Sequence, residues 1–399
     1  MNTLLLENIH PRAHDAFRKA GGPLRTEHGS LSENDLIDAL KGVELLGIRS
    51  RTHISRRVLA NAPDLLAVGA YCIGTNQIDL EAAALSGVAV FNAPYSNTRS
   101  VAELVIAEIV FLVRQILPKI ARAHEGHWDK SADRAREVRG KKLGIIGFGN
   151  IGSQVSTLAE AMGMDVYYFD TADKLSIGNA TRTGSLADIL GLADVVTVHV
   201  DGSPANTNLI GAPELALMKP GACLLNLSRG HVVDIDALAD AIRSGHIAGA
   251  AVDVFPAEPH DGREPFVTPL RGLPNVLLTP HIGGSTEEAQ ESIAEFVTGK
   301  LFDYVATGST ATSVNFPRII APRTDGAPSH RLLHIHRNVP GVLSQINGIF
   351  GKNNVNVLTQ FLRTNEHIGY VLADVDAHYQ DALFDDLVNV EHTIRVRIL

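Results

Sequence analysis

Hydrophobic residues in the first hundred positions form short runs that alternate with helix-like patterns. The apolar runs, which are typical of buried strands, cover residues 4–6, 43–47, 65–68 and 88–91. The segments between them that repeat apolar positions with a helical period are 32–40, 55–60 and 79–85. Such alternation is typical of a parallel sheet with helices on both faces, so the pattern predicts a doubly wound, flavodoxin-like α/β domain.

A second series of apolar runs predicts another α/β domain. A helical pattern over residues 98–117 leads into it. Ser96 or Asn97 is expected to cap this helix, and Pro118 to end it. The strands expected after it lie at 143–146, 166–169, 195–198, 223–227, 248–253 and 276–279. Six such strands with helices between them predict a Rossmann-like doubly wound sheet.

The helical pattern over residues 286–306 is expected to return the chain to the first domain. We therefore predict a discontinuous first domain of residues 1–97 and 285–315 and a second domain of residues 98–284. Residues 316–329 contain Pro317, Pro322 and Pro328 and are expected to form a linker.

Residues 330–399 show a third arrangement of elements. Strand patterns at 332–336, 355–363, 370–375 and 394–398 are interrupted by helical patterns at 340–350 and 379–387. This β-α-β-β-α-β order is that of a ferredoxin-like fold. The fold class expected for the chain is therefore α/β, with two doubly wound parallel-sheet domains and a C-terminal ferredoxin-like domain.

The composition argues against several functions. The 399 residues include 44 acidic and 35 basic side chains, a formal net charge of −9. Nucleic acids and anionic membranes favour a basic face, so neither is expected as a partner. The most apolar helical stretch, 101–113, contains Glu103 and Glu108, which argues against a membrane span. No basic segment precedes the first strand, so no signal peptide is expected, and Cys72 and Cys223 are expected to be free thiols in a cytoplasmic protein.

A glycine motif follows the first strand of the second domain. Gly147, Gly149 and Gly152 stand in Gly-x-Gly-x-x-Gly register before a helical pattern. The first glycine permits a tight turn, the second lets the backbone approach a pyrophosphate, and the third lets helix and strand pack closely. Asp170, at the end of the next strand, would accept hydrogen bonds from ribose hydroxyls and repel a 2′-phosphate. A glycine run alone is often only a turn, but this context predicts an NAD site.

Three polar residues at strand ends of the second domain form a chemically complete set for oxidising a 2-hydroxy acid. His281 would accept the hydroxyl proton, Glu258 would orient the ring and favour imidazolium, and Arg229 would hold the substrate carboxylate. Each residue also has an ordinary structural interpretation. His281 would then cap a helix or pack in a core, Arg229 would face a helix C-terminus, and Glu258 would be a solvated loop acid.

Other positions have open interpretations. Arg49 and Arg51 follow a strand of the first domain, where they would hold a phosphate or carboxylate or would be solvated surface charges. Trp128, the only tryptophan, is expected either in local core packing or in a subunit interface. His334 and His336 lack an accompanying cysteine or acidic cluster, so no metal site is expected.

Several motifs resemble those of a known family. Residues 147–152 with Asp170, 226–230, 253–259 and 279–284 resemble the D-isomer-specific 2-hydroxyacid dehydrogenases. Residues 49–52, 72–76 and 91–100 are similar, more narrowly, to the bacterial branch that acts on 3-phospho-D-glycerate. Residues 338–343, Asn-Val-Pro-Gly-Val-Leu, resemble the opening of an ACT domain, the serine-sensing module of that branch.

The resemblance implies an activity and roles for particular residues. It implies NAD-dependent oxidation of 3-phospho-D-glycerate to 3-phosphooxypyruvate, the first step of L-serine biosynthesis, with 2-oxoglutarate reduction as a side activity. It assigns catalysis to His281 as acid/base, Glu258 as its partner and Arg229 as the carboxylate clamp. The residues it places at the cofactor are Gly147, Gly149, Asn150, Ile151, Gly152, Asp170, Leu227, Ser228, Asp253, His281, Gly283 and Gly284.

The same resemblance implies two further ligand sites. Those expected to meet the phosphorylated substrate are Arg49, Ser50, Arg51, Gly74, Asn97 and Lys130. His336, Asn338 and Asn356 match positions that hold the effector L-serine across a subunit interface, and a homotetramer is expected. Residues 325–328, Asp-Gly-Ala-Pro, stand where relatives often have paired glycines, which predicts a stiffer joint before the ACT domain and a change in serine inhibition.

Other functions compete with this one. The nearest is a sister dehydrogenase acting on glyoxylate, hydroxypyruvate, D-lactate or 2-oxoglutarate. Two from different classes are a non-catalytic NAD sensor and an amino-acid-binding regulator whose dehydrogenase half has decayed. The intact set of Arg229, Glu258 and His281 argues against the last two, and Arg49 with Arg51 and the ACT motif argue against the first.

Overall fold

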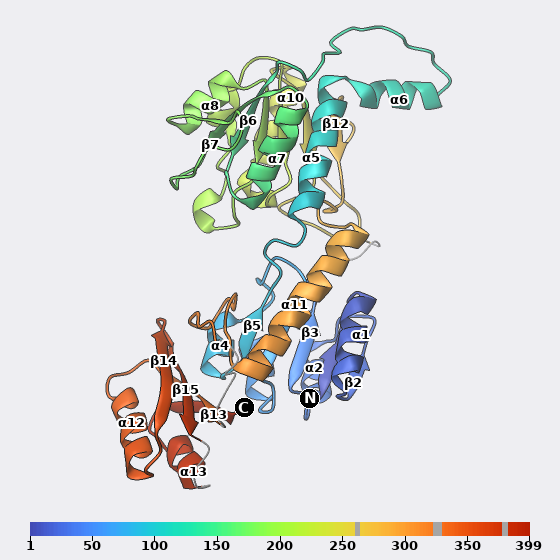
Figure 1. The fold of residues 1–399 in the computed structure, drawn as a ribbon. Coiled ribbons are helices and arrows are strands. Elements are labelled where there is room, and N and C mark those ends of the chain that lie inside the picture. The colour runs from blue at the N-terminus through green and yellow to red at the C-terminus, as the bar shows by residue number, and fades with distance from the viewer. Residues whose placement is uncertain (260–263, 322–328, 377–381) are drawn as a thin grey trace. The chain divides into compact units, whose positions relative to one another are not determined.

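A computed structural model describes residues 1–259, 264–321, 329–376 and 382–399 (Figure 1). The chain divides into two compact units. One unit combines Met1–Ser96 with Gln290–Leu399, and the other is Asn97–Ala289. Asp325 to Pro328 of the expected stiff joint, and the first residues of the helix expected at 379–387, lie outside the described residues.

The first unit begins with a five-stranded parallel sheet. Its strands are β1 (Thr3–Leu5), β2 (Leu24–Thr26), β3 (Leu45–Ile48), β4 (Ala67–Ala70) and β5 (Ala89–Phe91), in the order β2-β1-β3-β4-β5. The helices are α1 (Pro11–Ala20), α2 (Glu33–Ala39), α3 (Arg56–Ala60) and α4 (Leu80–Leu85). The doubly wound prediction is confirmed, but it lacked β2. That edge strand has two exposed residues of three, so it leaves no apolar run in the sequence.

The two faces of this sheet bury different residues. Leu4, Leu46 and Val68 belong to one hydrophobic cluster, whereas their chain neighbours Leu5 and Leu45 belong to another. This alternation follows from the two-residue period of a strand. The second cluster also takes in one side of α11 (Glu287–Thr307), whose residues from Gln290 onward belong to this unit. Both faces are therefore covered, as a parallel sheet requires.

The second unit contains a seven-stranded parallel sheet. Its strands are β6 (Lys142–Ile146), β7 (Asp165–Phe169), β8 (Thr181–Arg182), β9 (Val195–Val198), β10 (Ala222–Asn226), β11 (Ile247–Val252) and β12 (Val276–Leu278). They follow the order β12-β11-β10-β9-β6-β7-β8. The prediction of six strands was wrong by one, because β8 is a pair of exposed edge residues. The strand order reverses between β6 and β9, the switch point at which such sheets bind ligands.

The helices of this unit differ from the prediction at one place. They are α5 (Thr98–Val113), α6 (Ile116–His124), α7 (Asn150–Ala161), α8 (Leu186–Leu192), α9 (Ala212–Leu217) and α10 (Ile235–Arg243), with short 3-10 turns at Pro204–Asn206 and Gly230–Val232. The helix expected over 98–117 instead ends at Val113, because Gln115 has a positive φ of 54°. Pro118 does not end a helix. It lies in the first turn of α6, where its missing N–H is tolerated.

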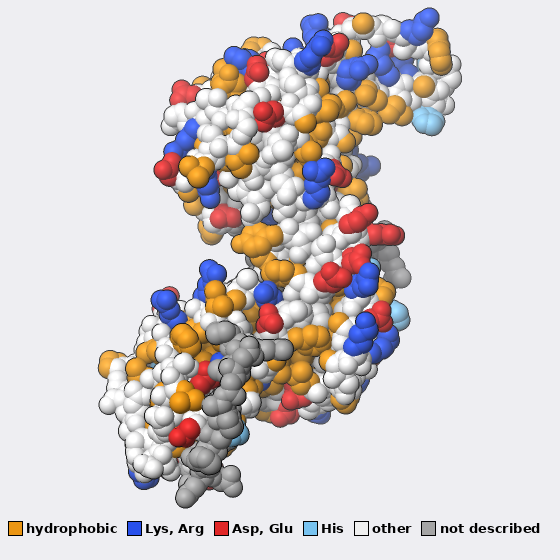
Figure 2. All heavy atoms as spheres, viewed as in Figure 1, with side chains coloured by type: hydrophobic (Ala, Val, Ile, Leu, Met, Phe, Trp, Pro, Cys, Tyr) orange, Lys and Arg blue, Asp and Glu red, His pale blue; other side chains and the backbone are white. Residues whose placement is uncertain are grey.

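Two other expectations for this region are corrected. Asn97 precedes α5, but its side chain makes no capping hydrogen bond. Trp128 is 86% exposed, so local core packing is wrong for it, and a subunit interface stays a prediction. Lys and Arg side chains gather over α6 and the segment after it, at the upper right of Figure 2. This end of the second unit is thus a charged, exposed surface with an exposed indole.

The C-terminal part of the first unit is the expected ferredoxin-like fold. Its elements are β13 (Ser329–Arg337), α12 (Val342–Lys352), β14 (Val357–Thr364), β15 (Ile368–Asp376), α13 (Ala382–Val388) and β16 (Thr393–Ile398). The antiparallel sheet has the order β14-β15-β13-β16. Val342, Ile346 and Phe350 of α12 and Leu383 and Leu387 of α13 pack together in one core. Both helices therefore cover the same face of the sheet.

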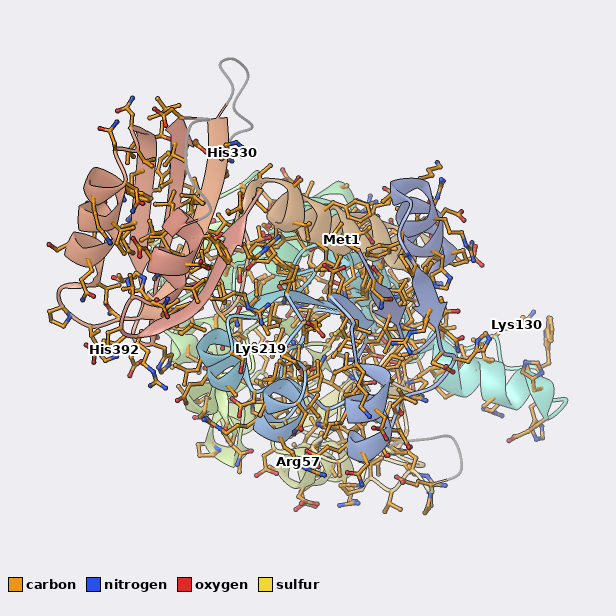
Figure 3. The ribbon with its side chains drawn as sticks, turned by 90° about the horizontal axis from the view of Figure 1, so that it is seen from below. Met1, Arg57, Lys130, Lys219, His330 and His392 are labelled. Carbon is orange, nitrogen blue, oxygen red and sulfur yellow. The ribbon has the colours of Figure 1, made fainter. Side chains whose placement is uncertain are left out.

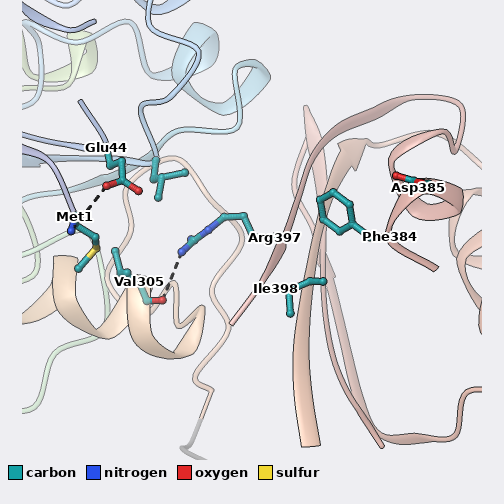
Figure 4. A pocket seen from close by; sticks show the side chains of 8 residues that line it. Met1, Glu44, Val305, Phe384, Asp385, Arg397 and Ile398 are labelled. Carbon is teal, nitrogen blue, oxygen red and sulfur yellow. Dashed lines mark hydrogen bonds and ion pairs between the residues drawn. The ribbon is translucent and has the colours of Figure 1, made fainter. Parts of the chain in front are cut away.

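A pocket of about 720 Å³ lies in the first unit (Figure 4). It is lined by Met1, Glu44, Leu66, Val305, Phe384, Asp385, Arg397 and Ile398. Arg397 donates there to the carbonyl oxygen of Val305 at 3.4 Å. This set shares no member with the residues predicted to bind cofactor, substrate or serine, so the pocket is distinct from the predicted sites. Within the described ranges, no helix combines the length and hydropathy that a membrane crossing requires.

Candidate active site

The glycine motif forms the turn between β6 and α7. Gly147 has a φ of +92°, and a Cβ there would lie 2.5 Å from the carbonyl oxygen of His199. A Cβ at Gly152 would lie 2.2 Å from the carbonyl oxygen of Gly147. These two glycines are therefore required by the protein's own packing, one for the turn and one for the close approach of helix to loop.

Gly149 is different because its surroundings are open. A Cβ at this position would meet nothing within 4 Å. Gly149 precedes α7 without a side-chain cap, and Asn150, the first residue of the helix, is exposed. The free N–H groups and positive dipole end of α7 thus face open space. The packing of the chain does not require this open space, or cradle, at Gly149. A pyrophosphate fits it.

Asp170 connects the end of β7 to the glycine turn. Its Oδ2 accepts a hydrogen bond from the Phe148 amide at 2.8 Å, and its Oδ1 accepts one from the Ala172 amide at 2.8 Å. Phe148 is itself buried and stacks on Tyr168 with ring centroids 3.9 Å apart. The carboxylate is therefore fixed beside the cradle, where a ribose diol suits it better than a 2′-phosphate. These residues fit NAD.

Asp253, directly after β11, supports the loop that contains His281. Its buried carboxylate accepts hydrogen bonds from Thr279 Oγ1 at 2.6 Å, from the Ile282 amide at 2.8 Å and from the Gly283 amide at 2.8 Å. His281 stands in the middle of this loop with a positive φ of 55°. That conformation is uncommon for a residue with a side chain and is kept here by the bonds on either side.

His281 and Glu258 form a hydrogen-bonded pair. Nδ1 of His281 lies 2.8 Å from Oε2 of Glu258, and Oε1 of Glu258 accepts the Phe255 amide at 3.0 Å. The side chains are 52% and 36% exposed, respectively. Because Nδ1 faces the carboxylate, Nε2 is the ring nitrogen that can exchange a proton with a substrate.

The pair shifts the pKa values of both partners. The hydrogen bond to Glu258 raises the pKa of His281 above its ordinary value, although partial burial and Arg229 act in the opposite direction. Burial raises the pKa of Glu258, but the bonds from His281 and the Phe255 amide lower it more, so that the net shift is downward. The carboxylate therefore stays ionised and favours imidazolium.

Arg229 is held near this pair by the turn after β10. Asn226, fully buried, accepts the Ser228 amide at 3.1 Å through Oδ1 and donates from Nδ2 to the Arg229 carbonyl at 3.0 Å. A Cβ on Gly230 would lie 2.0 Å from the carbonyl carbon of Phe255, so this turn packs directly against the loop that leads to Glu258. The charge of Arg229 lowers the pKa of both Glu258 and His281. The three predicted catalytic residues therefore lie close enough for the charge of Arg229 to act on both Glu258 and His281.

The remaining cofactor positions surround the same strand ends. Leu227 and Ser228 are buried after β10, and Ile151 is half-buried in the first turn of α7. Gly283 approaches Asp253 so closely that a Cβ would stand 3.0 Å from its Oδ2. A Cβ at Gly284 would lie 2.2 Å from Nδ2 of Asn97. All of these positions belong to the second unit, and the assignment of each to the cofactor stays a prediction.

The predicted substrate loop, Arg49 to Thr52, belongs to the first unit. Glu7 accepts the Arg51 amide at 3.0 Å and the Thr52 amide at 2.8 Å, and Gln77 donates to the Arg49 carbonyl at 2.7 Å. Among the described residues, neither arginine side chain enters an ion pair, and Ser50 is exposed. The loop is thus fixed at both ends while its guanidinium groups stay available for an anion.

Glu7 and Gln77 are functional candidates that the sequence did not indicate. Each acts on a backbone group 25 or more positions away, so no local spacing predicts the contact. The one unusual feature at Glu7 is its backbone, with a φ of 61°. Nε2 of Gln77 also lies 3.4 Å from the carbonyl oxygen of Gly74. A Cβ added at Gly74 would meet no atom within 4 Å, so the space beside this glycine is open. Together they join the two predicted substrate segments of this unit.

Among the described residues, Lys130 and Asn97 are not grouped with Arg229, Glu258 and His281 by the contacts of one chain. Lys130 is exposed in the segment after α6 (Figure 3) and is not among the groups that shift the pKa of His281 or Glu258. Asn97 lies beside Gly284, and its buried Oδ1 has no partner among the described residues. Both assignments stay predictions.

The predicted serine residues lie at two ends of the C-terminal sheet. His336 on β13 packs against Gly369, where a Cβ would lie 2.2 Å from its Nε2, and its buried Nδ1 has no partner in the described part of the chain. Asn338 donates to the Asn365 carbonyl at 2.8 Å near the same end. Asn356 bonds instead through its carbonyl to the Asp376 amide, at the far end of β15. Within one chain, Asn356 therefore lies at the opposite end of the sheet from His336 and Asn338.

The two neighbouring histidines of β13 do not form a metal site in the described residues. Nε2 of His334 lies 3.2 Å from the Leu387 carbonyl and 3.0 Å from Thr393 Oγ1. Burial lowers the pKa of His334 to about 4, so the ring is neutral at ordinary pH. In the ranges that the structure describes, no three His, Cys, Asp or Glu side chains are grouped as metal ligands.

Comparison with known proteins agrees with this geometry. The family model described as "D-isomer specific 2-hydroxyacid dehydrogenase, NAD binding domain" matches residues 106–283, and that of an "AHAS small subunit-like ACT domain" matches residues 332–395. D-3-phosphoglycerate dehydrogenase of Escherichia coli (strain K12) is 49% identical over 399 residues, covering 99% of this chain and 97% of the relative. D-3-phosphoglycerate dehydrogenase 2 of Saccharomyces cerevisiae is 44% identical over 412 residues, covering 100% and 87%.

Solved structures show the same fold. A D-lactate dehydrogenase from Sporolactobacillus sp is 34% identical with a TM-score of 0.68, covering 79% of this chain and 99% of that one. The Aquifex aeolicus D-lactate dehydrogenase complexed with NAD and lactic acid is 26% identical with a TM-score of 0.68, covering 79% and 100%. The chain therefore belongs to the D-isomer specific 2-hydroxyacid dehydrogenase family, and it is an NAD-dependent oxidoreductase with a C-terminal ACT domain.

Proposed function

We propose that this enzyme oxidises 3-phospho-D-glycerate to 3-phosphooxypyruvate with NAD, the first step of L-serine biosynthesis. The observation that supports the reaction class best is the 2.8 Å hydrogen bond between His281 and Glu258 beside Arg229. The choice of substrate rests on the full-length relatives of that name and on Arg49 and Arg51, whose loop is fixed by Glu7.

The cofactor site consists of the glycine turn, the N-terminus of α7 and Asp170. When bound there, NAD supplies the acceptor for the hydride that leaves C2 of the substrate. The open space beside Gly149 admits the pyrophosphate, and the fixed carboxylate of Asp170 accepts hydrogen bonds from the ribose hydroxyls.

His281 takes the proton of the substrate hydroxyl. As the hydride departs, the hydroxyl proton moves to Nε2, and the carboxylate of Glu258 stabilises the imidazolium that forms. Oxidation needs a neutral ring at the outset, so its rate rises as the pH increases through the raised pKa of His281. Reduction of the oxo acid needs the imidazolium, and its rate declines over the same range.

Arginines bind the two anionic ends of the substrate. Arg229 holds the C1 carboxylate by forked hydrogen bonds and polarises the C2 oxygen as it becomes a carbonyl. Arg49 and Arg51, with Ser50 and the open backbone at Gly74, bind the phosphate, and Asn97 and Lys130 complete the substrate contacts.

A substrate panel with NAD tests this function. We expect the highest kcat/KM with 3-phospho-D-glycerate, a low rate of 2-oxoglutarate reduction, and inhibition by added L-serine. A higher kcat/KM with glycolate, D-glycerate or D-lactate would assign the enzyme to a sister activity. No turnover with any of them, together with NAD binding, would make the protein a sensor.

The His281→Asn variant tests the chemical step. Its kcat should fall by roughly 10²–10⁴-fold, because a general acid/base contributes about that much. His392→Asn is the control, since His392 is an exposed histidine of the ACT domain (Figure 3). Near-normal turnover of His281→Asn would exclude the role given to His281.

We also propose a cytoplasmic homotetramer with the domain boundaries predicted above. The separation of Asn356 from His336 and Asn338 within one chain supports a serine site completed by a second copy. The exposed β14 residues Leu358, Phe361 and Leu362 lie on the edge strand of the ACT sheet and suit a subunit contact. Light scattering with and without serine measures the subunit number, and a monomer would contradict the shared site.

A further inference from the structure

Glu108 is a buried acid in the middle of α5. The spacing of Val101, Val105, Glu108 and Leu112 places them on one stripe of the helix, and all four are buried. Glu108 is only 3% exposed, and neither of its carboxyl oxygens has a hydrogen-bond partner among the described residues. An apolar side chain would fill such a position at lower cost, so the acid calls for an explanation.

Among the described residues, the elements that pack most against α5 present no buried cation to Glu108. α5 packs against α7, β10, β11 and α6. Of the titratable groups on these elements, Glu160 of α7 is exposed, Cys223 of β10 is a neutral buried thiol, and Lys119, Arg122 and His124 belong to α6, which has no buried residue. On α5 itself, Arg99 and Glu103 pair with each other at 2.6 Å on the exposed side. The charge that acts on Glu108 is that of Asp253, directly after β11.

Burial and the Asp253 carboxylate both favour the protonated form of Glu108. Burial raises its pKa, and Asp253 raises it further, to about 8. Two carboxylates in one interior region cannot both be ionised without a large electrostatic cost. Asp253 accepts three hydrogen bonds, whereas Glu108 has none in the described residues, so the proton belongs on Glu108.

Asp253 connects this acid to the catalytic loop. It binds the amides of Ile282 and Gly283, the two residues after His281. α5 also touches the loop directly, since a Cβ on Gly283 would lie 3.5 Å from a methyl carbon of Val101. A change of charge at Glu108 therefore acts on the groups that hold His281 in its positive-φ conformation.

We propose that Glu108 is a positioning residue that stays uncharged in the active enzyme, leaving Asp253 as the anion that holds the His281 loop, and that ionisation of Glu108 releases this loop. Glu108 gives up its proton to solvent hydroxide or buffer as the pH rises. The second negative charge is then relieved by movement of Asp253 away from α5, which weakens its bonds to the two amides. The inference rests on the proposed function for its effect on turnover, but the protonation state itself does not.

Infrared difference spectroscopy tests the protonation state without substrate. The wild-type enzyme should show the C=O stretch of a buried neutral carboxyl group at pH 6.5, and the band should disappear between pH 7 and 9. Glu108→Gln should lack the band, and Glu103→Gln should keep it, because Glu103 is an exposed, paired acid on the same helix. A spectrum without the band in the wild type would overturn the proposal, whatever reaction the enzyme catalyses.

The pH dependence of kcat tests the positioning role. In the oxidation direction the wild-type value should rise as His281 loses its proton and then fall by at least fivefold above pH 8. In Glu108→Gln, which is neutral at every pH, the fall should move up by at least one pH unit, with kcat near neutral pH retained within about threefold. Glu103→Gln should follow the wild type.

An alkaline limb in Glu108→Gln identical to that of the wild type would reject the role of Glu108. If Glu108→Gln is poorly folded, Glu108→Leu, which removes the buried polar group altogether, should show the same shifted limb. A shift in KM for 3-phospho-D-glycerate with unchanged kcat would also contradict a role exerted through His281.

Discussion

The imidazole of His281 and the carboxylate of Glu258 meet at 2.8 Å although the residues are 23 positions apart in the chain. Each belongs to a loop with its own support. Glu258 is held by the Phe255 amide, and the His281 loop by Asp253. The pair is therefore oriented before any substrate arrives, which is what proton transfer in a defined direction requires.

Replacing Glu258 with Gln should change the pH profile as well as the rate. The pKa of His281 is raised first of all by Glu258, so the variant should have a lower pKa at His281. The rising limb of the oxidation profile should then move to lower pH, while kcat falls by roughly 10²-fold because the imidazolium is no longer stabilised. Steady-state kinetics from pH 5.5 to 9 measure both effects. An unchanged limb would mean that the pair does not control the titration.

Replacing Arg229 with Lys should weaken substrate binding more than it lowers the stability of the fold. Lysine keeps the charge but loses the forked geometry, so kcat/KM should fall by roughly tenfold or more. The rising limb should stay near its wild-type position, since the positive charge that lowers the pKa of His281 is retained. Arg243→Lys, at an exposed arginine paired with Asp240, is the control. Equal kinetics for the two variants would argue against the clamp.

Gly149→Ala and Gly152→Ala should have opposite effects. A Cβ at Gly149 meets nothing, so this variant should keep its thermal stability but bind NAD more weakly. A Cβ at Gly152 meets the Gly147 carbonyl at 2.2 Å, so that variant should lose about 1–3 kcal/mol of unfolding free energy even without cofactor. Thermal melts and NAD titrations separate the two. Unchanged NAD affinity in Gly149→Ala would remove the pyrophosphate from this cradle.

Replacing Glu7 with Gln should weaken recognition of the substrate phosphate. Glutamine has one carbonyl oxygen and no charge. One of the amides of Arg51 and Thr52 would therefore lose its acceptor, the other would keep only a neutral acceptor, and the Arg49 to Thr52 loop would loosen. We expect KM for 3-phospho-D-glycerate to rise by roughly tenfold, with a much smaller change for D-glycerate. Arg49→Ala should show the same selectivity, and Glu33→Gln, an exposed acid on α2, should show neither effect. A similar KM increase for both substrates would argue against a phosphate site.

Glu108 should also give stability a particular pH dependence. Its pKa is raised on folding, so the unfolded chain releases the proton above its ordinary pKa while the folded chain keeps it up to about pH 8. Folding stability should therefore fall as the pH increases through this window, by a total on the order of 4 kcal/mol, and level off above it. Urea unfolding from pH 5 to 9 should show a flatter profile in Glu108→Gln than in the wild type. Parallel profiles would mean that Glu108 ionises normally in the fold.

Sequence patterns predicted those parts of the architecture that depend on residues close together in the chain. Apolar runs and helical periods indicated both parallel sheets and the ferredoxin-like fold, and the glycine spacing within one turn indicated the dinucleotide site. They failed at β2 and β8, which are short edge strands with exposed residues, and at Gln115, where one positive φ splits a helical pattern into α5 and α6. Edges and helix breaks depend on neighbours in space more than on periodicity.

Tertiary structure alone decided which polar groups meet. The sequence contains Glu103 and Glu108 in one apolar helix, but only folding makes the first an exposed partner of Arg99 and the second a buried acid near Asp253. The contacts of Glu7 with the Arg51 amide and of His281 with Glu258 likewise join residues from different loops. Strand and helix patterns are set by neighbouring residues in the chain, whereas protonation states and hydrogen-bond partners are set by burial and charge after distant segments have packed together.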